Sequence, residues 1–264
     1  MSFAFSSRNA DARRLVYLER MGIDVWRRRR RAERSLPGAE EALAPQTPEA
    51  AMAPRDQPRS TPAPVTFEEE LAGCGWEEVR ERILNCTRCA LHESRTQGVV
   101  GVGDPHASLM IIGEAPGAEE DRRGEPFVGR AGKLLDQMLF AIGLARENVY
   151  ITNILKSRPP QNRDPLPEEV AACEPYLRRQ IELISPRVMV AVGRVAAQNL
   201  LKTEQPLGRL RGHWHEYGPQ RTPLLVTYHP AYLLRKPQDK RKAWQDLRQL
   251  RARLAAPAEA EPAS

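Results

Sequence analysis

The chain has 264 residues, of which 28% are charged and 41% hydrophobic, and its net charge is +6. No apolar run approaches the ~20 residues that a bilayer span needs, and the amino terminus lacks the apolar core of a secretion signal. These features are typical of a soluble protein with room for one α/β domain, and we expect no signal peptide. The excess of basic residues favours a polyanionic partner, nucleic acid first.

The first 66 residues predict two segments that precede the folded domain. Residues 1–36 form a basic segment, in which the arginine run Arg27–Arg31 either contacts phosphates or stays a solvated tail. Residues 37–66 are rich in Pro, Ala, Glu and Gln and have almost no large apolar residues, so we expect a disordered linker. The folded domain then spans residues 67–254, and a frayed tail follows over residues 255–264.

Within residues 67–254, short apolar runs alternate with helical patterns. After a helix expected over "WEEVRERIL", the apolar runs are "LMIIG", "VYITN", "VMVAVG" and "LLVTYH". Each run is apolar nearly throughout, as expected for a strand covered on both faces. Four strands that alternate with helices predict a three-layer α/β/α fold with a central four-stranded parallel sheet.

Polar residues and glycines gather where these strands end. The first strand runs into "GEAPGAEED", the second ends at Asn153, and the fourth ends at His229. Taken singly, each is typical of an ordinary turn or surface position. Ligands of a parallel sheet bind outside the carboxyl ends of its strands, so together these residues predict one cleft.

Four motifs in this order resemble those of the family-four uracil-DNA glycosylases, the iron–sulfur type of bacteria and archaea. They are "GEAPGAEED", "PFVGRAGKLLD", "YITNILK…RPPQNRDP" and "YHPAYLLR", within a match over roughly residues 76–250. The resemblance implies an enzyme that excises uracil from DNA in base excision repair, leaves an abasic site, and works as a cytoplasmic, nucleoid-associated monomer. A non-catalytic DNA-binding or damage-sensing module on the same fold is the alternative, although such a module would not need His229.

The resemblance also implies roles for individual residues. The uracil ring would stack on Phe127, Asn153 would read its Watson–Crick edge, and His229 would donate to O2, where negative charge develops. The backbone around Gly113 and Ala115 would hold the ring. Glu120, or less strongly Glu114, would orient the attacking water.

Contacts to the rest of the DNA are expected after the last strand. Leu233 or Leu234 would fill the gap that the flipped base leaves in the stack. Arg235 would meet a phosphate, or else belong to a solvated helix face. A related branch that joins covalently to DNA carries a histidine in a long basic insertion after the second strand. The segment "ILKSRPPQNRDP" is short and has no histidine, which disfavours that branch.

The family's 4Fe-4S cluster is held by a C-x-x-C pair and two further cysteines sixteen positions apart. Cys86 and Cys89 match the pair and Cys173 matches the fourth ligand, whereas the third position is occupied by Ser157. Three alternatives stay open: a cluster with three cysteines, a cluster completed by Cys74, or loss of the cluster. A helix between Cys74 and Cys86 would hold those two thiols about 15 Å apart, which disfavours Cys74. A zinc site that includes His92 is a further alternative.

Overall fold

A six-stranded mixed sheet lies at the centre of the computed structural model, which describes residues 66–256. The strands follow the order β1-β3-β2-β4-β6-β5. The predicted basic segment, nearly all of the linker, and most of the tail lie outside the described residues. The sheet is built from β1 (Val102–Gly103), β2 (Leu109–Gly113), β3 (Tyr150–Asn153), β4 (Val188–Val192), β5 (Trp214–Tyr217) and β6 (Thr222–Thr227).

The four inner strands, β3, β2, β4 and β6, run parallel, as the sequence predicted. The two outer strands, β1 and β5, were not predicted, and both pair antiparallel with their neighbours. β1 has only two residues, too few for a recognisable apolar run. β5 is half exposed and follows the alternation of an edge strand, so it has no continuous apolar run in the sequence.

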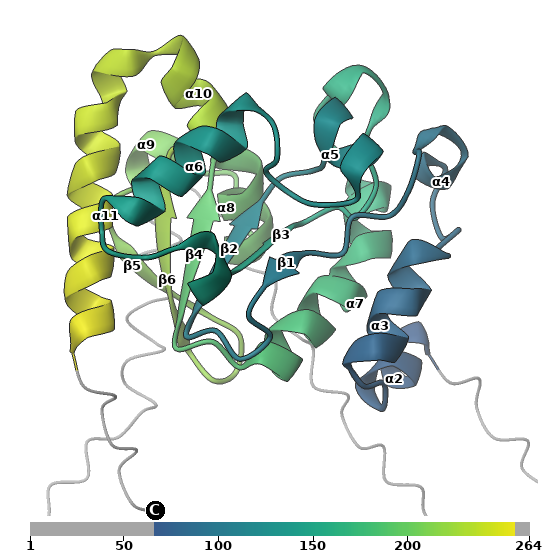
Figure 1. Cartoon of the computed structure of the whole chain (residues 1–264). Helices are drawn as coiled ribbons and strands as arrows, with labels where there is room; N and C mark the ends of the chain where they lie inside the picture. Colours follow the sequence, from purple (N-terminus) through teal and green to yellow (C-terminus); the bar gives the residue numbers. More distant parts are fainter. Residues whose placement is uncertain (1–65, 257–264) are drawn as a thin grey trace, which may run out of the picture. The chain divides into compact units, whose positions relative to one another are not determined.

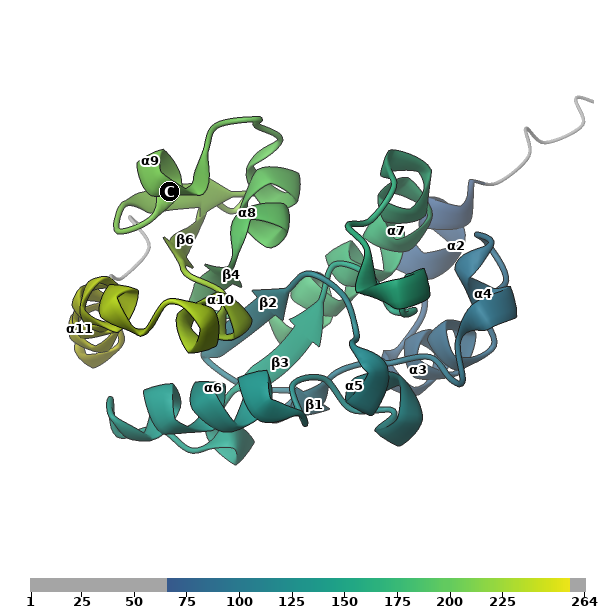
Figure 2. The same cartoon turned by 90° about the horizontal axis from the view of Figure 1, so that it is seen from above.

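Helices cover both faces of the sheet and complete the three layers (Figures 1 and 2). One face carries α6 (Arg130–Phe140), α10 (Pro230–Arg235) and α11 (Lys240–Ala255), and the other carries α7 (Pro167–Ile184) and α8 (Arg194–Leu201). Two helices at the amino-terminal end, α2 (Phe67–Ala72) and α3 (Trp76–Leu84), pack against α7. The remaining short helices are α4 (Leu91–Ser94), α5 (Ala118–Arg123) and α9 (Leu207–Leu210), with single turns η1 (Arg146–Asn148), η2 (Pro160–Asn162) and η3 (Pro237–Asp239).

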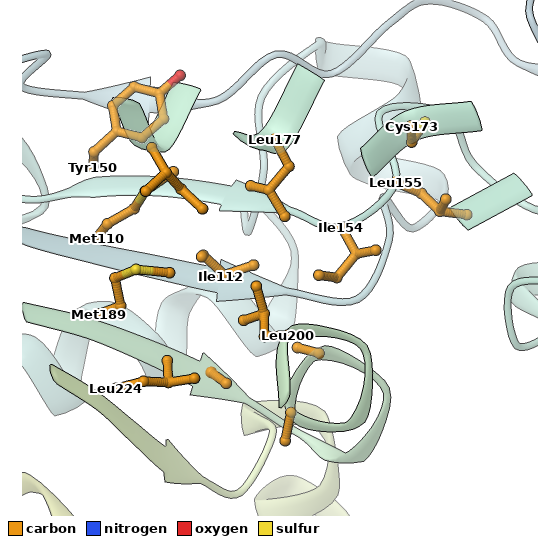
Figure 3. Packing of buried hydrophobic residues seen from close by; sticks show 14 of the residues in the cluster. Met110, Ile112, Tyr150, Ile154, Leu155, Cys173, Leu177, Met189, Leu200 and Leu224 are labelled. Atoms are coloured by element: carbon orange, nitrogen blue, oxygen red, sulfur yellow. The ribbon is translucent and has the colours of Figure 1, made fainter. Parts of the chain in front are cut away.

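Alternation along the buried strands divides the core into two layers. In β2, Met110 and Ile112 face α7 and α8, whereas Leu109 and Ile111 face α6 and α11. Figure 3 shows the first layer, in which Met110 and Ile112 lie near Leu177. Because both faces are covered, every residue of β2 is buried, which explains why the strand reads as a continuous apolar run.

The chain reverses direction across the sheet between β2 and β4. From β2 the chain passes to β3 on one side of β2. It then returns through α7 to β4, which lies on the other side of β2. Such a switch point opens a crevice at the carboxyl ends of the two strands, the usual place for a ligand in an open α/β sheet.

No helix among residues 66–256 is both long enough and apolar enough to cross a membrane.

Candidate active site

A cavity of about 580 Å³ opens at the carboxyl ends of the inner strands, within the size range of small-molecule sites. It is formed by the segments that follow β2, β3, β4 and β6. The predicted site residues that line it are Glu114, Ala115, Glu120, Phe127, Asn153, His229 and Arg235. The expectation that these strand ends share one cleft is thus met in the structure.

Asn153 presents an unsatisfied acceptor at the floor of this cavity. Its side chain is 2% exposed, and its Oδ1 is the buried side-chain nitrogen or oxygen atom within residues 66–256 that lacks a hydrogen-bond partner. The following main chain is fixed, because Ile154 N donates to Gly113 O at 2.9 Å and Leu155 N donates to Glu114 O at 3.0 Å. A buried acceptor without a partner is costly in free energy. A ligand that brings a donor to Asn153 Oδ1 therefore gains a hydrogen bond that is missing in the free protein.

Phe127 forms an aromatic wall of the site from a strained loop. Its φ is 55°, a left-handed conformation that residues other than glycine rarely adopt. The Arg146 guanidinium holds the loop by donating to the carbonyl oxygens of Pro126 and Phe127, and it pairs with Asp136 at 3.2 Å. Gly132 permits the close approach, because a Cβ there would lie 1.7 Å from Phe127 O.

The Glu120 carboxylate is hydrogen-bonded to backbone amides of the same loop. Its Oε2 accepts from Gly117 N at 3.1 Å, and its Oε1 accepts from Val128 N at 3.1 Å and Gly129 N at 3.0 Å. Both carboxylate oxygens therefore join the start of α5 to the segment that carries Phe127. This geometry suits a brace for the aromatic wall better than a group that activates water.

Glu114 differs from Glu120 in having a free carboxylate. Within residues 66–256, its two carboxylate oxygens have no hydrogen-bond partner, and the side chain lines the cavity. Burial raises the pKa of Glu114, and the nearby Asp164 raises it further, while Arg194 opposes both. A raised pKa makes the ionised form of Glu114 a stronger base.

His229 lies at the amino terminus of α10, where its Nδ1 accepts a hydrogen bond from Ala231 N at 3.1 Å. Burial, followed by the positive charge of Arg235, lowers the pKa of His229 to about 4, against a smaller opposing effect of Glu120. At neutral pH the ring is therefore uncharged with its proton on Nε2. Its centroid lies 5.5 Å from that of Phe127, at an interplanar angle of 30°.

The two candidate wedge leucines separate clearly. Leu233 is 1% exposed and belongs to the core layer under α6 and α11, so it is not available to DNA. Leu234 is 36% exposed on the same helix. Of the predicted pair, only Leu234 can act as the wedge.

Three functional-site residues were missed by the sequence reasoning. Arg194 and Asp164 line the cavity and form an ion pair at 2.5 Å, and Arg146 supports Phe127 from outside it. Arg194 directly follows the end of β4, so the strand-end rule could have found it. Arg146 carries no such signal, because it stands alone between a helix and a strand.

The predicted cluster residues lie apart from the cavity, in a separate cysteine pocket (Cys86, Cys89, Cys173 and Ser157). Burial raises the pKa of Cys173 to about 11 and also raises the pKa of Cys89. The proximity of Cys86 raises both values further. The three thiols are therefore neighbours. Ser157 is 4% exposed, and its Oγ accepts a hydrogen bond from Arg95 at 2.9 Å.

This donor set does not fit a cluster with four protein ligands. The fourth position offers a hydroxyl already bonded to a guanidinium, and a hydroxyl is a poorer iron ligand than a thiolate. Across residues 66–256, no group of three or more His, Cys, Asp or Glu side chains is arranged to hold a metal ion.

The two alternative ligands have other partners. Cys74 is buried beside α2, where its thiol donates to Glu70 O at 3.2 Å. The helix expected between Cys74 and Cys86 is present as α3. His92 Nδ1 donates to Cys89 O at 2.8 Å, so this imidazole caps the loop of the cysteine pair.

Comparison with known proteins agrees with the geometry of the cavity. The family model of the uracil DNA glycosylase superfamily matches residues 100–248, and the chain therefore belongs to this superfamily. The enzyme class predicted from the motifs is thereby confirmed.

The curated relatives identify the branch. A type-4 uracil-DNA glycosylase of Archaeoglobus fulgidus is 49% identical over 61% of this chain and 84% of its own length. One from Thermotoga maritima is 46% identical over 60% of this chain and 83% of its own length, and one from Sulfurisphaera tokodaii is 41% identical over 66% and 83%. These similarities confirm the resemblance to the type-4 enzymes.

Proposed function

We propose that the chain hydrolyses the N-glycosidic bond of deoxyuridine in DNA, releases uracil, and leaves an abasic site that base excision repair can process. One observation carries the proposal: the unpartnered Asn153 Oδ1, buried at the floor of a cavity that also holds Phe127 and His229. Uracil is a planar imide whose N3–H and O4 offer a donor and an acceptor side by side. The amide of Asn153 offers the complementary acceptor and donor.

Recognition of uracil follows from these groups. The base leaves the DNA stack and lies against the Phe127 ring, with its N3–H donating to Asn153 Oδ1 and its O4 accepting from Asn153 Nδ2. Cytosine carries an acceptor at N3 and a donor at C4, so it meets the amide with both groups reversed. Rejection of a base that leaves buried polar groups unpaired can be strong.

Bond cleavage needs a group that stabilises the departing base. As the bond between C1′ and N1 breaks, its electron pair passes to uracil, and negative charge develops on O2. The neutral His229 can donate from Nε2 to that oxygen, because Nδ1 is already occupied by Ala231 N. A donor aimed at charge that exists only in the transition state lowers the barrier instead of merely binding substrate.

Hydrolysis is completed by water. The Glu114 carboxylate accepts a proton from the water that attacks C1′, and its negative charge also stabilises the cation-like sugar. Glu120 holds the loop that carries Phe127. No step is assigned to the cysteine pocket, whose residues lie outside the cavity lining.

The DNA partner would contact Arg235, which lines the cavity, through a phosphate, and the exposed Leu234 of the same helix would fill the gap in the stack. The monomeric state and the cytoplasmic, nucleoid-associated location remain proposals that rest on the family.

The direct test is incubation of the purified chain with a single-uracil oligonucleotide, followed by alkali to cleave abasic sites. The matched oligonucleotide with thymine at the same position is the control. We expect cleavage of the uracil strand alone. Absence of alkali-labile product between pH 6 and 9 would contradict the proposed reaction.

A further inference from the structure

Lys156 is a fully buried lysine that the proposed reaction leaves without a role. It lies three residues after Asn153 and is 1% exposed. Its Nζ lies 2.7 Å from Thr152 Oγ1, 2.9 Å from the main-chain oxygen of Asn153, and 2.6 Å from Gln180 Oε1. None of the ion pairs formed within residues 66–256 includes it, so the ammonium is held by neutral oxygens alone.

The partners of Lys156 can only accept. The Thr152 hydroxyl donates its hydrogen bond to Val100 O at 2.9 Å, and the Gln180 amide nitrogen donates to the same carbonyl at 3.0 Å. The oxygens that remain toward Nζ, together with the main-chain carbonyl, are three acceptors. The protonated form of Lys156 supplies three protons, one for each acceptor, and burial lowers the pKa of this amine to about 7.

The segment around Lys156 is fixed at both ends. Val99 N donates to Lys156 O at 2.8 Å, and Gln180 reaches the network from the carboxyl-terminal part of α7. Nζ therefore joins the end of β3 to a helix on the face of the sheet shown in Figure 3. One of its three bonds reaches the residue whose side chain forms the cavity floor.

We propose that Lys156 is the positioning residue for Asn153 and so sets the rate at which uracil is excised. Asn153 Oδ1 has no partner in the free protein, which favours any rotation of the residue that would let this oxygen find a donor. The bond from Nζ to the main-chain oxygen of Asn153 fixes the peptide group that follows the Asn153 Cα, and so opposes such a rotation of the main chain. Lys156 does not line the cavity, so it acts only through Asn153.

This inference rests on the proposed function, and a double-mutant cycle tests it. Lys156→Met, Asn153→Ala and the double variant are compared with the parent chain by single-turnover excision from a uracil oligonucleotide, together with DNA affinity and melting temperature. We expect Lys156→Met to slow excision about a hundredfold in the parent background with DNA affinity changed less than threefold. In the Asn153→Ala background it should cause no further loss.

Gln180→Met is the matched control. Gln180 is as deeply buried as Lys156 and belongs to the same network, yet it does not contact Asn153. We expect this variant to lower the melting temperature while excision stays within about threefold of the parent chain. If Lys156→Met does not fold, Lys156→Gln replaces it in the same cycle, because its neutral side chain is one atom shorter and draws the donor back from the Asn153 carbonyl.

The outcomes separate the two claims. Equal losses from Lys156→Met in both backgrounds, or no loss in either, would overturn the positioning role, because a residue that acts through Asn153 cannot matter once that amide is gone. If the parent chain excises no uracil, the proposed function fails before the cycle begins.

Discussion

Gly113 lies so close to Asn153 that a Cβ at residue 113 would be 2.4 Å from Asn153 Oδ1 and 2.7 Å from the Phe127 ring. The last residue of β2 thus determines whether the two proposed base-binding side chains can occupy their positions. Glycine is required here for space, because both neighbours are held by their own loops and strands.

Gly113→Ala is therefore expected to lower the single-turnover rate of uracil excision by about a hundredfold or more, with a modest fall in melting temperature. The added methyl group displaces Asn153, Phe127 or both. Gly73→Ala is the matched control, because a Cβ there meets nothing within 4 Å. Equal activity of the two variants would show that the pocket tolerates the methyl group and that the packing is looser than described.

His229→Gln should slow the chemical step about a hundredfold and leave DNA affinity nearly unchanged, by analogy with the loss of one oxyanion donor. Single-turnover kinetics and DNA titration measure the two quantities separately. A loss in affinity that equals the loss in rate would assign His229 to substrate positioning alone.

The depressed pKa of His229 also predicts a dependence of stability on pH. The folded chain takes up the proton near pH 4 and the unfolded chain near pH 6.5, so the unfolded state binds more protons between these values. The free energy of unfolding that the neutral, buried ring contributes is fully present above pH 6.5 and is lost as the pH falls through about 4. Denaturant unfolding should show the parent chain losing more stability than His229→Gln across this window, and parallel curves would contradict the burial of the ring.

Substitution of Glu114 should mainly lower the excision rate, whereas substitution of Glu120 should mainly lower the melting temperature. Glu114→Gln removes the free carboxylate of the cavity, so excision should fall by about a hundredfold or more while the melting temperature holds. Glu120→Gln loses an acceptor of backbone amides, so the main expected effect is a lower melting temperature with a smaller loss of rate. The reverse pattern would return the water-orienting role to Glu120.

Much of this arrangement could be predicted from the sequence, because burial of the central strands on both faces leaves a plain signal. The runs from Leu109 and from Val188 are strands at those positions, and the helix expected over "WEEVRERIL" is α3. The antiparallel edges escaped because pairing on one side only does not require apolar residues on both faces. The hairpin between β5 and β6 does carry a turn signal in the sequence, at Gly218–Arg221.

The site was predictable only as far as strand ends and motifs define it. Asn153, Phe127 and His229 follow from that rule and from the resemblance to the family. Which glutamate is free and which leucine is exposed depend on hydrogen bonds and packing between distant segments. The spacing of residues along the chain does not predict that Val128 N donates to Glu120, or that Leu233 is buried in the core.

Ser157→Cys should make the cysteine pocket a better site for iron. Anaerobic reconstitution with iron and sulfide, followed by chelator challenge, should leave more iron per chain in this variant than in the parent chain, because thiolate binds iron more covalently than a hydroxyl. Cys74→Ala should change neither value, since its thiol bonds to Glu70 O. Equal retention in parent and Ser157→Cys chains would show that Ser157 is no ligand position.

The central claim, that the Asn153 amide selects uracil, is tested most directly by excision from matched oligonucleotides that differ only in uracil or cytosine at one position. The parent chain should release uracil and leave cytosine intact. Asn153→Asp should lose about a hundredfold or more on uracil, because a carboxylate cannot donate to O4, and should gain measurable release of cytosine, whose amino group it can accept. If Asn153→Asp excises uracil at the parent rate, Asn153 does not read the base and this account of the site is contradicted.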